Sequence, residues 1–178
     1  MSKQIVIYKS KRKATIIALV GLLLMITGWL FLQYPDNAIA GWSFIIFGAI
    51  CLIFGIGTRL DRKPYLILSE SGITEMFSVR EEIAWSAIRQ ANEFFYIGQY
   101  FIRLLVDRNY KPDLIQPTWF YRFDRLYARE GVKAIFIRTS FLAISSVKLV
   151  SLINRLMKAD AAERARILDK VPKNLTSN

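Results

Sequence analysis

Two long stretches without a charged residue dominate the hydrophobic pattern at the start of the chain. They are ATIIALVGLLLMITGWLFL at residues 14–32 and AIAGWSFIIFGAICLIFGIGT at residues 38–58. A helix of about 20 residues is roughly 30 Å long, which matches the hydrocarbon core of a bilayer. Both stretches are apolar all round rather than on one face, which is typical of helices surrounded by lipid. The pattern predicts a transmembrane helical hairpin at 14–58, with QYPDN at 33–37 as its turn.

Basic residues lie outside this hairpin and not at its turn. Those that flank the two stretches are Lys3, Lys9, Lys11, Arg12, Lys13, Arg59, Arg62 and Lys63. The turn itself carries only Asp36. Because cytoplasmic flanks collect Lys and Arg, we expect both termini to be cytoplasmic. A cleaved signal peptide ending at Ala38-Ile39-Ala40 is the alternative, which the length of the first stretch and the immediate start of the second disfavour.

Glycines recur every seven residues in both stretches. They are Gly21 and Gly28 in the first and Gly41, Gly48 and Gly55 in the second. Small residues on one stripe let membrane helices approach closely, and a seven-residue period favours a left-handed crossing. The stripes could join the two helices of one chain or those of two chains, so a homo-oligomer stays open. Neither stretch contains an acidic or basic residue, and we therefore interpret the hairpin as an anchor rather than a transport path.

The remainder, residues 64–170, is one domain's worth of chain. Alternating apolar positions and turn residues predict strands at 65–68, 73–77, 79–85, 89–97 and 99–107, and one or two more within 134–144. From Ser146 the apolar positions follow helical spacing, and 159–170 continues as a polar helix. This pattern predicts an α+β domain, in which an antiparallel barrel or sandwich is capped by a C-terminal helix.

Three local features complete this organisation. The N-terminal segment 1–13 includes Gln4–Tyr8, whose alternation predicts an edge strand of the domain's sheet. In IAWSAI we expect Trp85 to be a buried anchor beside a tight turn, because core packing is a commoner role for such a side chain than ligand contact. We expect residues 171–178 to form a disordered tail.

The plan of several antiparallel strands followed by a helix is that of a pleckstrin-homology-like (PH-like) domain. The leading QIVIYKSKRK, the double apolar run, LILSESGI, IAWSAI and SSVKLVSLINRL together resemble small bacterial membrane proteins of uncharacterised function. The resemblance spans most of the chain. It implies two transmembrane helices followed by a cytoplasmic PH-like domain, and with it a location in the bacterial inner membrane. It implies no active-site residue.

One segment, PTWFYRFDRLYARE at residues 117–130, has the residue pattern of a binding surface. At helical spacing an apolar arc of about 120° contains Trp119, Phe120, Phe123, Leu126 and Tyr127. Arg122, Arg125 and Arg129 lie on its flank. Such a helix suits the headgroup layer of a membrane. It suits packing on the domain equally well, and the two alternatives stay open. If the segment contacts lipid or a protein partner, we expect the contact residues to be Trp119, Arg122, Phe123, Arg125 and Arg129.

The residue types that most enzymes need are scarce. The chain has no histidine, which removes His-based triads and histidine metal sites, and its one cysteine, Cys51, lies inside the second apolar stretch. Neither a Walker-type nor a G-x-G-x-x-G phosphate loop is present. Glu81 and Glu82 would point to opposite faces of a strand and cannot share a site. We therefore expect no enzyme, no cofactor and no metal site.

The charge balance bears on the partners. The chain has a formal net charge of +11, but the domain from Pro64 onward has 17 Lys and Arg against 12 Asp and Glu, which does not favour a nucleic-acid binder. Our first hypothesis is a membrane-anchored binding module that presents its domain to a protein partner or to anionic lipid headgroups. The alternative is a self-associating structural or protective membrane protein, of the immunity or envelope-stress type, that oligomerises through the glycine stripes.

Overall fold

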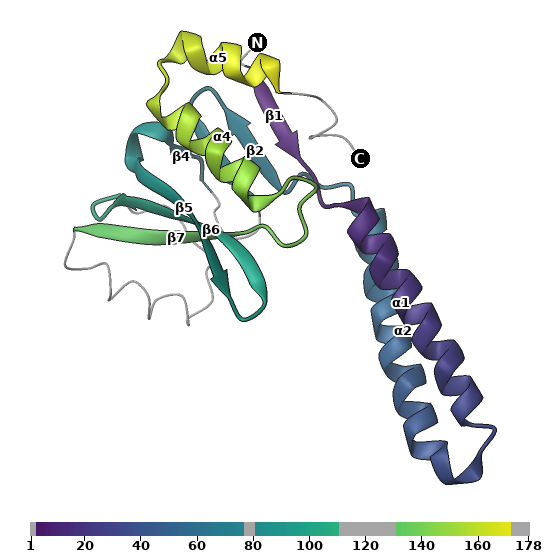
Figure 1. Ribbon diagram of the computed structural model, residues 1–178. Coiled ribbons are helices and arrows are strands. Elements are labelled where there is room, and N and C mark those ends of the chain that lie inside the picture. Colours follow the sequence, from purple (N-terminus) through teal and green to yellow (C-terminus); the bar gives the residue numbers. More distant parts are fainter. Residues whose placement is uncertain (1–2, 77–80, 111–130, 172–178) are drawn as a thin grey trace. The chain divides into compact units, whose positions relative to one another are not determined.

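The computed structural model describes residues 3–76, 81–110 and 131–171, which belong to two compact units (Figure 1). The helical unit is Lys9–Lys63, and the β-sheet unit combines Met1–Tyr8 with Pro64–Asn178. The expected interfacial segment 117–130 and most of the expected tail lie outside the described residues.

The helical unit is an antiparallel pair of helices, α1 (Lys11–Phe31) and α2 (Ala38–Leu60). A short 3₁₀ turn, Pro35–Asn37, joins them at the position of the predicted turn. Helix α1 begins ahead of the apolar stretch because the Ser10 hydroxyl accepts a hydrogen bond from the Lys13 N–H, which satisfies one of the unpaired donors of the first turn. Both helices are long and apolar enough to cross a membrane.

The first sheet of the β-sheet unit has four antiparallel strands. Their order is β1 (Gln4–Ile7), β2 (Leu66–Ser69), β3 (Gly72–Glu75) and β4 (Ile83–Ala84). Strand β1 lies at the edge, where Gln4 is opposite Ser69 and Ile7 is opposite Leu66. The alternating N-terminal segment therefore adds a strand to the sheet, although the whole helical unit separates it from β2 in the sequence.

The second sheet has three antiparallel strands, β5 (Ile88–Tyr96), β6 (Gln99–Asp107) and β7 (Val132–Arg138), in that order. A bulge near Arg89 shifts the register at the start of β5, and its guanidinium binds the Asp107 carboxylate at 2.7 Å. Within the described ranges no strand of one sheet pairs with a strand of the other. The β-sheet unit is therefore two antiparallel sheets, and closure into a barrel stays an expectation.

Two predicted strands differ from the observed ones. Of the strand expected at 79–85, the described residues form only Ile83–Ala84, because Trp85 begins a 3₁₀ turn, Trp85–Ala87. Within 134–144 there is one strand, and it ends at Arg138, where Thr139 donates its N–H to the Tyr100 carbonyl at 2.9 Å and the chain turns away. The periodicity of the sequence predicts the apolar faces of these two strands, but it does not predict the residues at which the strands begin and end.

The described part of the β-sheet unit ends in the helices α4 (Ser146–Lys158) and α5 (Ala161–Lys170), and α4 packs on β5 and β6 (Figure 1). The amphipathic face of α4 buries Leu149, Leu152, Ile153 and Leu156 in the main core. The amide of Asn154 fixes the helix further by donating to the Ala91 carbonyl of β5 at 3.0 Å. The helical spacing read from Ser146 onward thus corresponds to a core-covering helix.

Trp85 is the largest fully buried side chain of the core, with 1% of its surface exposed. Its indole N–H donates to the Ser69 carbonyl at the end of β2, at 3.0 Å. Because the ring fills core volume and its polar atom has a backbone partner, the side chain links β2 to the turn that leads into β5. The buried anchor predicted from IAWSAI is therefore present.

The tight turn between β5 and β6 uses a residue that its backbone conformation disfavours. Ile97 and Gly98 both have positive φ, 46° and 71°, as in the two-residue turns whose preferred residues are Asn-Gly. A β-branched residue in this conformation costs about 1–2 kcal/mol. We expect Ile97→Asn to raise the free energy of unfolding of the β-sheet unit by about 1 kcal/mol, measured by thermal unfolding of the solubilised chain. Gln99→Asn, in the adjacent strand, is the control; an Ile97→Asn variant less stable than wild type would contradict the strain.

Candidate functional site

The five predicted glycines all lie where α1 meets α2. A Cβ atom on Gly21 would lie 2.6 Å from the Leu52 nitrogen, and one on Gly28 would lie 2.6 Å from the Gly41 carbonyl oxygen. Gly48 and Gly55 meet α1 backbone at 2.7 Å and 2.6 Å in the same way. The neighbouring atoms are backbone, so no side chain can move to make room. Both glycine stripes are thus used for packing within one chain.

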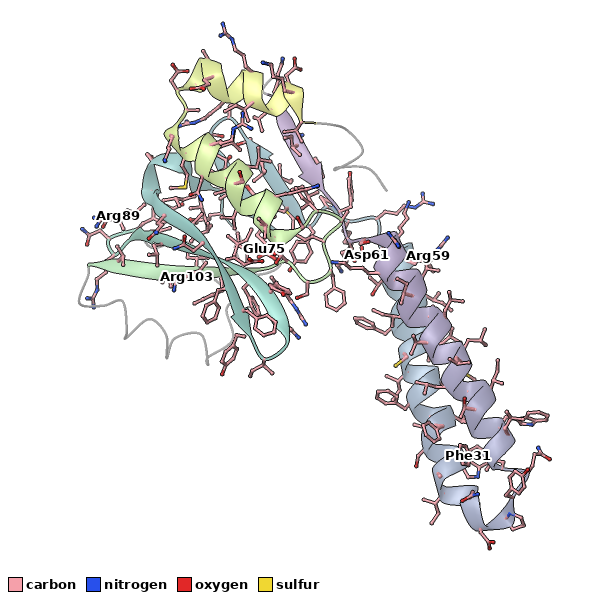
Figure 2. The ribbon with its side chains drawn as sticks, in the orientation of Figure 1. Phe31, Arg59, Asp61, Glu75, Arg89 and Arg103 are labelled. Atoms are coloured by element: carbon pink, nitrogen blue, oxygen red, sulfur yellow. The ribbon has the colours of Figure 1, made fainter. Side chains whose placement is uncertain are left out.

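A polar cluster closes the end of the helical unit where its two chain ends lie. The Lys9 ammonium contacts the Asp61 carboxylate at 2.7 Å, and that carboxylate also accepts the Lys63 N–H at 3.1 Å. The hydrogen bond from Lys9 holds the pKa of Asp61 below its usual value. Nearby, the Arg59 guanidinium bonds the Thr15 hydroxyl, and Figure 2 shows Arg59 and Asp61 at this end. The basic flanks, which the sequence relates to orientation, therefore also join the two helices.

A buried carboxylate lies at the end of strand β3 in the β-sheet unit. Glu75, at the end of β3, is 1% exposed and receives a hydrogen bond from the Tyr65 phenol (Figure 2). Burial, together with the negative charge of Glu75, raises the pKa of Tyr65 far above its usual value, while Arg138 acts in the opposite direction. The phenol therefore stays protonated and acts as a donor. We interpret the pair as a structural link between the two ends of the β2–β3 hairpin.

Glu82, half of the acidic pair considered in the sequence, has a structural role of this kind. Its carboxylate accepts hydrogen bonds from the hydroxyls of Ser69 and Ser71, the latter at 2.8 Å, on the β2–β3 turn. It thus ties the turn to the segment before β4. Both Glu81 and Glu82 precede β4, which begins at Ile83, so the expectation that they point to opposite faces of a strand does not apply to them.

Among the residues that the structure describes, α4 and α5 border a candidate binding groove, which we call the cationic groove. It has a volume of about 210 Å³ and is lined by Ile144, Lys148, Leu152, Arg155, Ile167, Lys170 and Val171. Of its aliphatic residues, Ile144, Leu152 and Ile167 are buried, whereas the three basic residues are exposed. None of these seven residues is acidic. The groove is smaller than a typical drug-sized pocket, so it suits one anionic group with a short apolar neighbour.

The local sequence explains the shape of the cationic groove. Lys148 and Arg155 are seven residues apart on α4, which places them on one face two turns apart. Asp160 caps the start of α5 by accepting the Glu163 N–H at 2.7 Å. Arg164 then donates from its Nε to the Leu156 carbonyl at 2.9 Å, which holds α5 against the end of α4. The groove is thus bordered by two helices that are hydrogen-bonded together.

The outer face of the second sheet carries a separate aromatic cluster. Its buried members are Phe101, Leu105, Val132, Ala134 and Phe136. Phe94 packs against it, and the Arg103 guanidinium lies 6.0 Å from the Phe94 ring centroid. The sheet therefore has apolar surfaces on both faces.

The contact residues selected from the sequence and the described lining of the cationic groove are different sets of residues. Trp119, Arg122, Phe123, Arg125 and Arg129 lie outside the described residues, and their role stays a prediction. Sequence reasoning treated 146–158 as a core helix and missed Lys148 and Arg155 as a pair. The available signal was their seven-residue spacing on the polar side of α4, but their partner Lys170 belongs to another helix. In the described part of the chain, no group of three His, Cys, Asp or Glu residues could hold a metal ion.

No protein-family model, no curated protein and no solved structure matches this chain.

Proposed function

We propose that the chain is an integral membrane protein of the bacterial inner membrane, whose helical hairpin anchors a cytoplasmic binding domain. The observation that carries the proposal is the exposure of the helices: side chains such as Leu23 and Ile53 are 63% and 72% exposed although neither helix has a polar face. In water such a surface would cost about 25 cal/mol per Å² of apolar area. Lipid around α1 and α2 removes that cost.

The orientation and the domain type belong to the same proposal. Basic residues on the outer flanks of the hairpin favour cytoplasmic termini. Four strands, then three strands, then an amphipathic helix follow each other in the order expected for a PH-like domain. We therefore assign the β-sheet unit to this type, with the cationic groove beside its C-terminal helix.

The chemistry of the cationic groove supports binding rather than catalysis. Three basic side chains beside aliphatic ones complement a carboxylate or a phosphate that carries an apolar neighbour. Acidic protein segments and anionic lipid headgroups both provide that combination. A domain tethered to the membrane meets either at high effective concentration.

The self-associating alternative has less support. It required the glycine stripes to join two chains, whereas all five glycines contact the neighbouring helix of the same chain. Self-association would need another face of the hairpin. We therefore keep the binding module as the proposed function.

Photo-cross-linking in membranes tests the binding function. A benzoylphenylalanine at Ser151, which is exposed on α4 between Lys148 and Arg155, should capture an acidic protein or an anionic lipid. Each basic residue near an anionic surface contributes roughly 1 kcal/mol. The double variant Lys148→Glu/Arg155→Glu removes two such residues, about 2 kcal/mol, and should therefore lower the captured amount about thirtyfold.

The matched control is Lys158→Glu/Arg166→Glu, which makes the same charge change at exposed positions of α4 and α5 outside the groove. Equal capture by both double variants would exclude the groove. Reporter fusions after Asn37 and at the C-terminus provide the topology control, because the proposal requires opposite sides of the membrane. The two reporters on one side would exclude the anchor itself.

A further inference from the structure

The β5–β6 turn carries an apolar surface, which we call the hairpin tip and define as Phe95, Ile97 and Tyr100. These side chains are 58%, 77% and 48% exposed. Phe95 and Tyr100 are directly opposite each other on the two strands, and their ring centroids are 4.9 Å apart. The tip is therefore a preformed aromatic pair beside an exposed isoleucine.

The tip extends the core-facing row of the second sheet beyond the core. Ala91 opposite Leu104 belongs to that row and is fully buried, as is Ile102 two residues further along β6. The exposed Glu93 lies opposite Ile102, and Phe95 and Tyr100 form the next pair of the row, four residues from Ala91 and two from Ile102. Two large aromatic side chains therefore end the row outside the core, and such exposed apolar patches mark interaction sites.

The backbone conformation of the turn adds an independent observation. Ile97 has a φ of 46°, a conformation in which a β-branched residue is an outlier. Asn or Gly at this position would relieve the strain at no cost to the ladder. An exposed, strained isoleucine in a solvent-facing turn adds nothing to folding, which indicates that its side chain serves a contact.

The tip lies at one particular end of the β-sheet unit. Tyr100 donates its N–H to the Ser140 hydroxyl at 3.0 Å and accepts the Thr139 N–H at 2.9 Å. Three residues further along the same loop, Ala143 donates its N–H to the Tyr8 carbonyl at 3.3 Å. Tyr8 is the last residue of the unit before the chain continues into the helical unit. The loop 139–143 thus connects the base of the tip to the point where the chain leaves for the hairpin.

The second chain connection leaves from the same end. Tyr65, which directly follows Pro64, donates its N–H to the Ile7 carbonyl at 3.0 Å. Arg138, the last residue of β7 before this loop, has its guanidinium 5.1 Å from the ring of Phe141 in the loop. Aromatic rings beside an arginine are the combination found at the headgroup level of membranes. The basic residues Lys9, Arg62 and Lys63, adjacent in sequence to the two connections, have the same preference.

From these observations we propose that the hairpin tip inserts into the headgroup layer of the membrane that the helices cross. The occupant of this apolar surface is an anionic phospholipid bilayer, because the tip, the arginine and both connections to the apolar helices share one end of the unit. The inference rests on the proposed membrane anchoring. It adds a second, reversible contact through which the domain meets the lipid surface.

Depth-dependent fluorescence in the full chain tests the proposal. The background variant is Cys51→Ala, which removes the native thiol. Each nanodisc holds one chain, and about one-third of its lipid is phosphatidylglycerol, which gives the bilayer an anionic surface. The environment-sensitive dye NBD is attached at Ile97→Cys or, in a second variant, at Phe95→Cys. We expect a blue-shifted emission and a loss of emission when the lipids carry a headgroup-depth nitroxide quencher.

Dyes at two reference positions distinguish a failure of the tip contact from a failure of the membrane anchor. Ile46→Cys, exposed on α2, reports whether the hairpin is in the bilayer. Ala162→Cys lies exposed on α5, whose Arg164 contacts the Glu70 carbonyl at the opposite end of β2, so it should give aqueous emission. Blue-shifted emission at 46 with aqueous emission at 95 and 97 would overturn the tip contact alone. Aqueous emission at 46 would overturn the anchor.

A third outcome and a further variant complete the test. A blue shift at 97 without quenching would mean that protein rather than lipid covers the tip, and it would overturn the proposal. Ile97→Asn in the Phe95→Cys background gives a variant whose turn is better suited to its conformation. It should lower the quenching at position 95, because the apolar side chain at the apex is gone. Unchanged quenching would overturn the role of Ile97.

Discussion

Trp85→Ala should lower the free energy of unfolding of the β-sheet unit by about 3–5 kcal/mol, the usual cost of removing a large aromatic side chain from a core. The ring is 1% exposed, and its removal leaves a cavity among β2, the 3₁₀ turn and β5. It also removes the donor to the Ser69 carbonyl. Since the free energy of unfolding of a natural domain is only about 5–15 kcal/mol, we expect this loss to let much of the domain unfold transiently. Hydrogen exchange of peptides that cover β2 and β3, measured on the full solubilised chain, should show the loss of protection.

Two control variants separate volume from hydrogen bonding at Trp85. Trp85→Phe keeps most of the apolar volume and loses the indole donor, so it should cost less than Trp85→Ala. Val147→Ala, 64% exposed on α4, should change stability by less than about 0.5 kcal/mol. If Trp85→Ala left the exchange of β2 and β3 unchanged, the core position of the indole would be wrong.

Gly48→Ile should separate α1 from α2 along their middle. Even a Cβ atom there would lie 2.7 Å from the Gly21 carbonyl oxygen and 2.9 Å from the Met25 nitrogen, so the backbones must move apart. Forcing extra atoms into a close-packed contact costs about 1–3 kcal/mol for each site, and it also removes neighbouring van der Waals contacts. The measurement is electron–electron distance spectroscopy between spin labels at Leu23→Cys and Ile53→Cys in the Cys51→Ala background. The distribution should broaden and shift to longer distances.

Gly57→Ile is the matched control, because Gly57 lies on the same helix and a Cβ atom there meets nothing within 4 Å. Its distance distribution should equal that of the labelled parent. Gly48→Ala tests the smallest increment and should give an intermediate broadening. Equal distributions for Gly48→Ile and Gly57→Ile would contradict the intrachain contact, and with it the argument that the stripes are not available for self-association.

The sequence alone predicts part of what is expected for Gly48 and for Trp85. The seven-residue spacing already identified Gly48 as an interface residue, but the same spacing fits a contact within a chain and one between chains. Only the atoms that face each glycine distinguish the two. For Trp85, burial followed from its size and from the pattern of IAWSAI, whereas its bond to Ser69 joins residues 16 apart in the sequence.

The candidate site shows where sequence reasoning stops. The aromatic, arginine-flanked pattern at 117–130 drew attention because it is continuous in the sequence. Lys148, Arg155 and Lys170 did not, because α4 and α5 bring them together only by their packing. The hairpin tip was missed for a similar reason: a turn was expected at Gly98, but periodicity does not indicate that Phe95 and Tyr100 extend past the core.

By itself, the sequence determined the features that depend on local patterns: two apolar helices joined by a short turn, a β-hairpin that turns at Gly98, and an amphipathic helix from Ser146. Their signals are local because burial on one face, or on all faces, repeats with the period of the element. Tertiary structure decided that the predicted edge strand pairs with β2, that the described strands form two sheets, and that three basic residues far apart in the sequence line one groove. Those features arise from contacts between segments far apart in the chain, and the residues on each side carry no information about their partner.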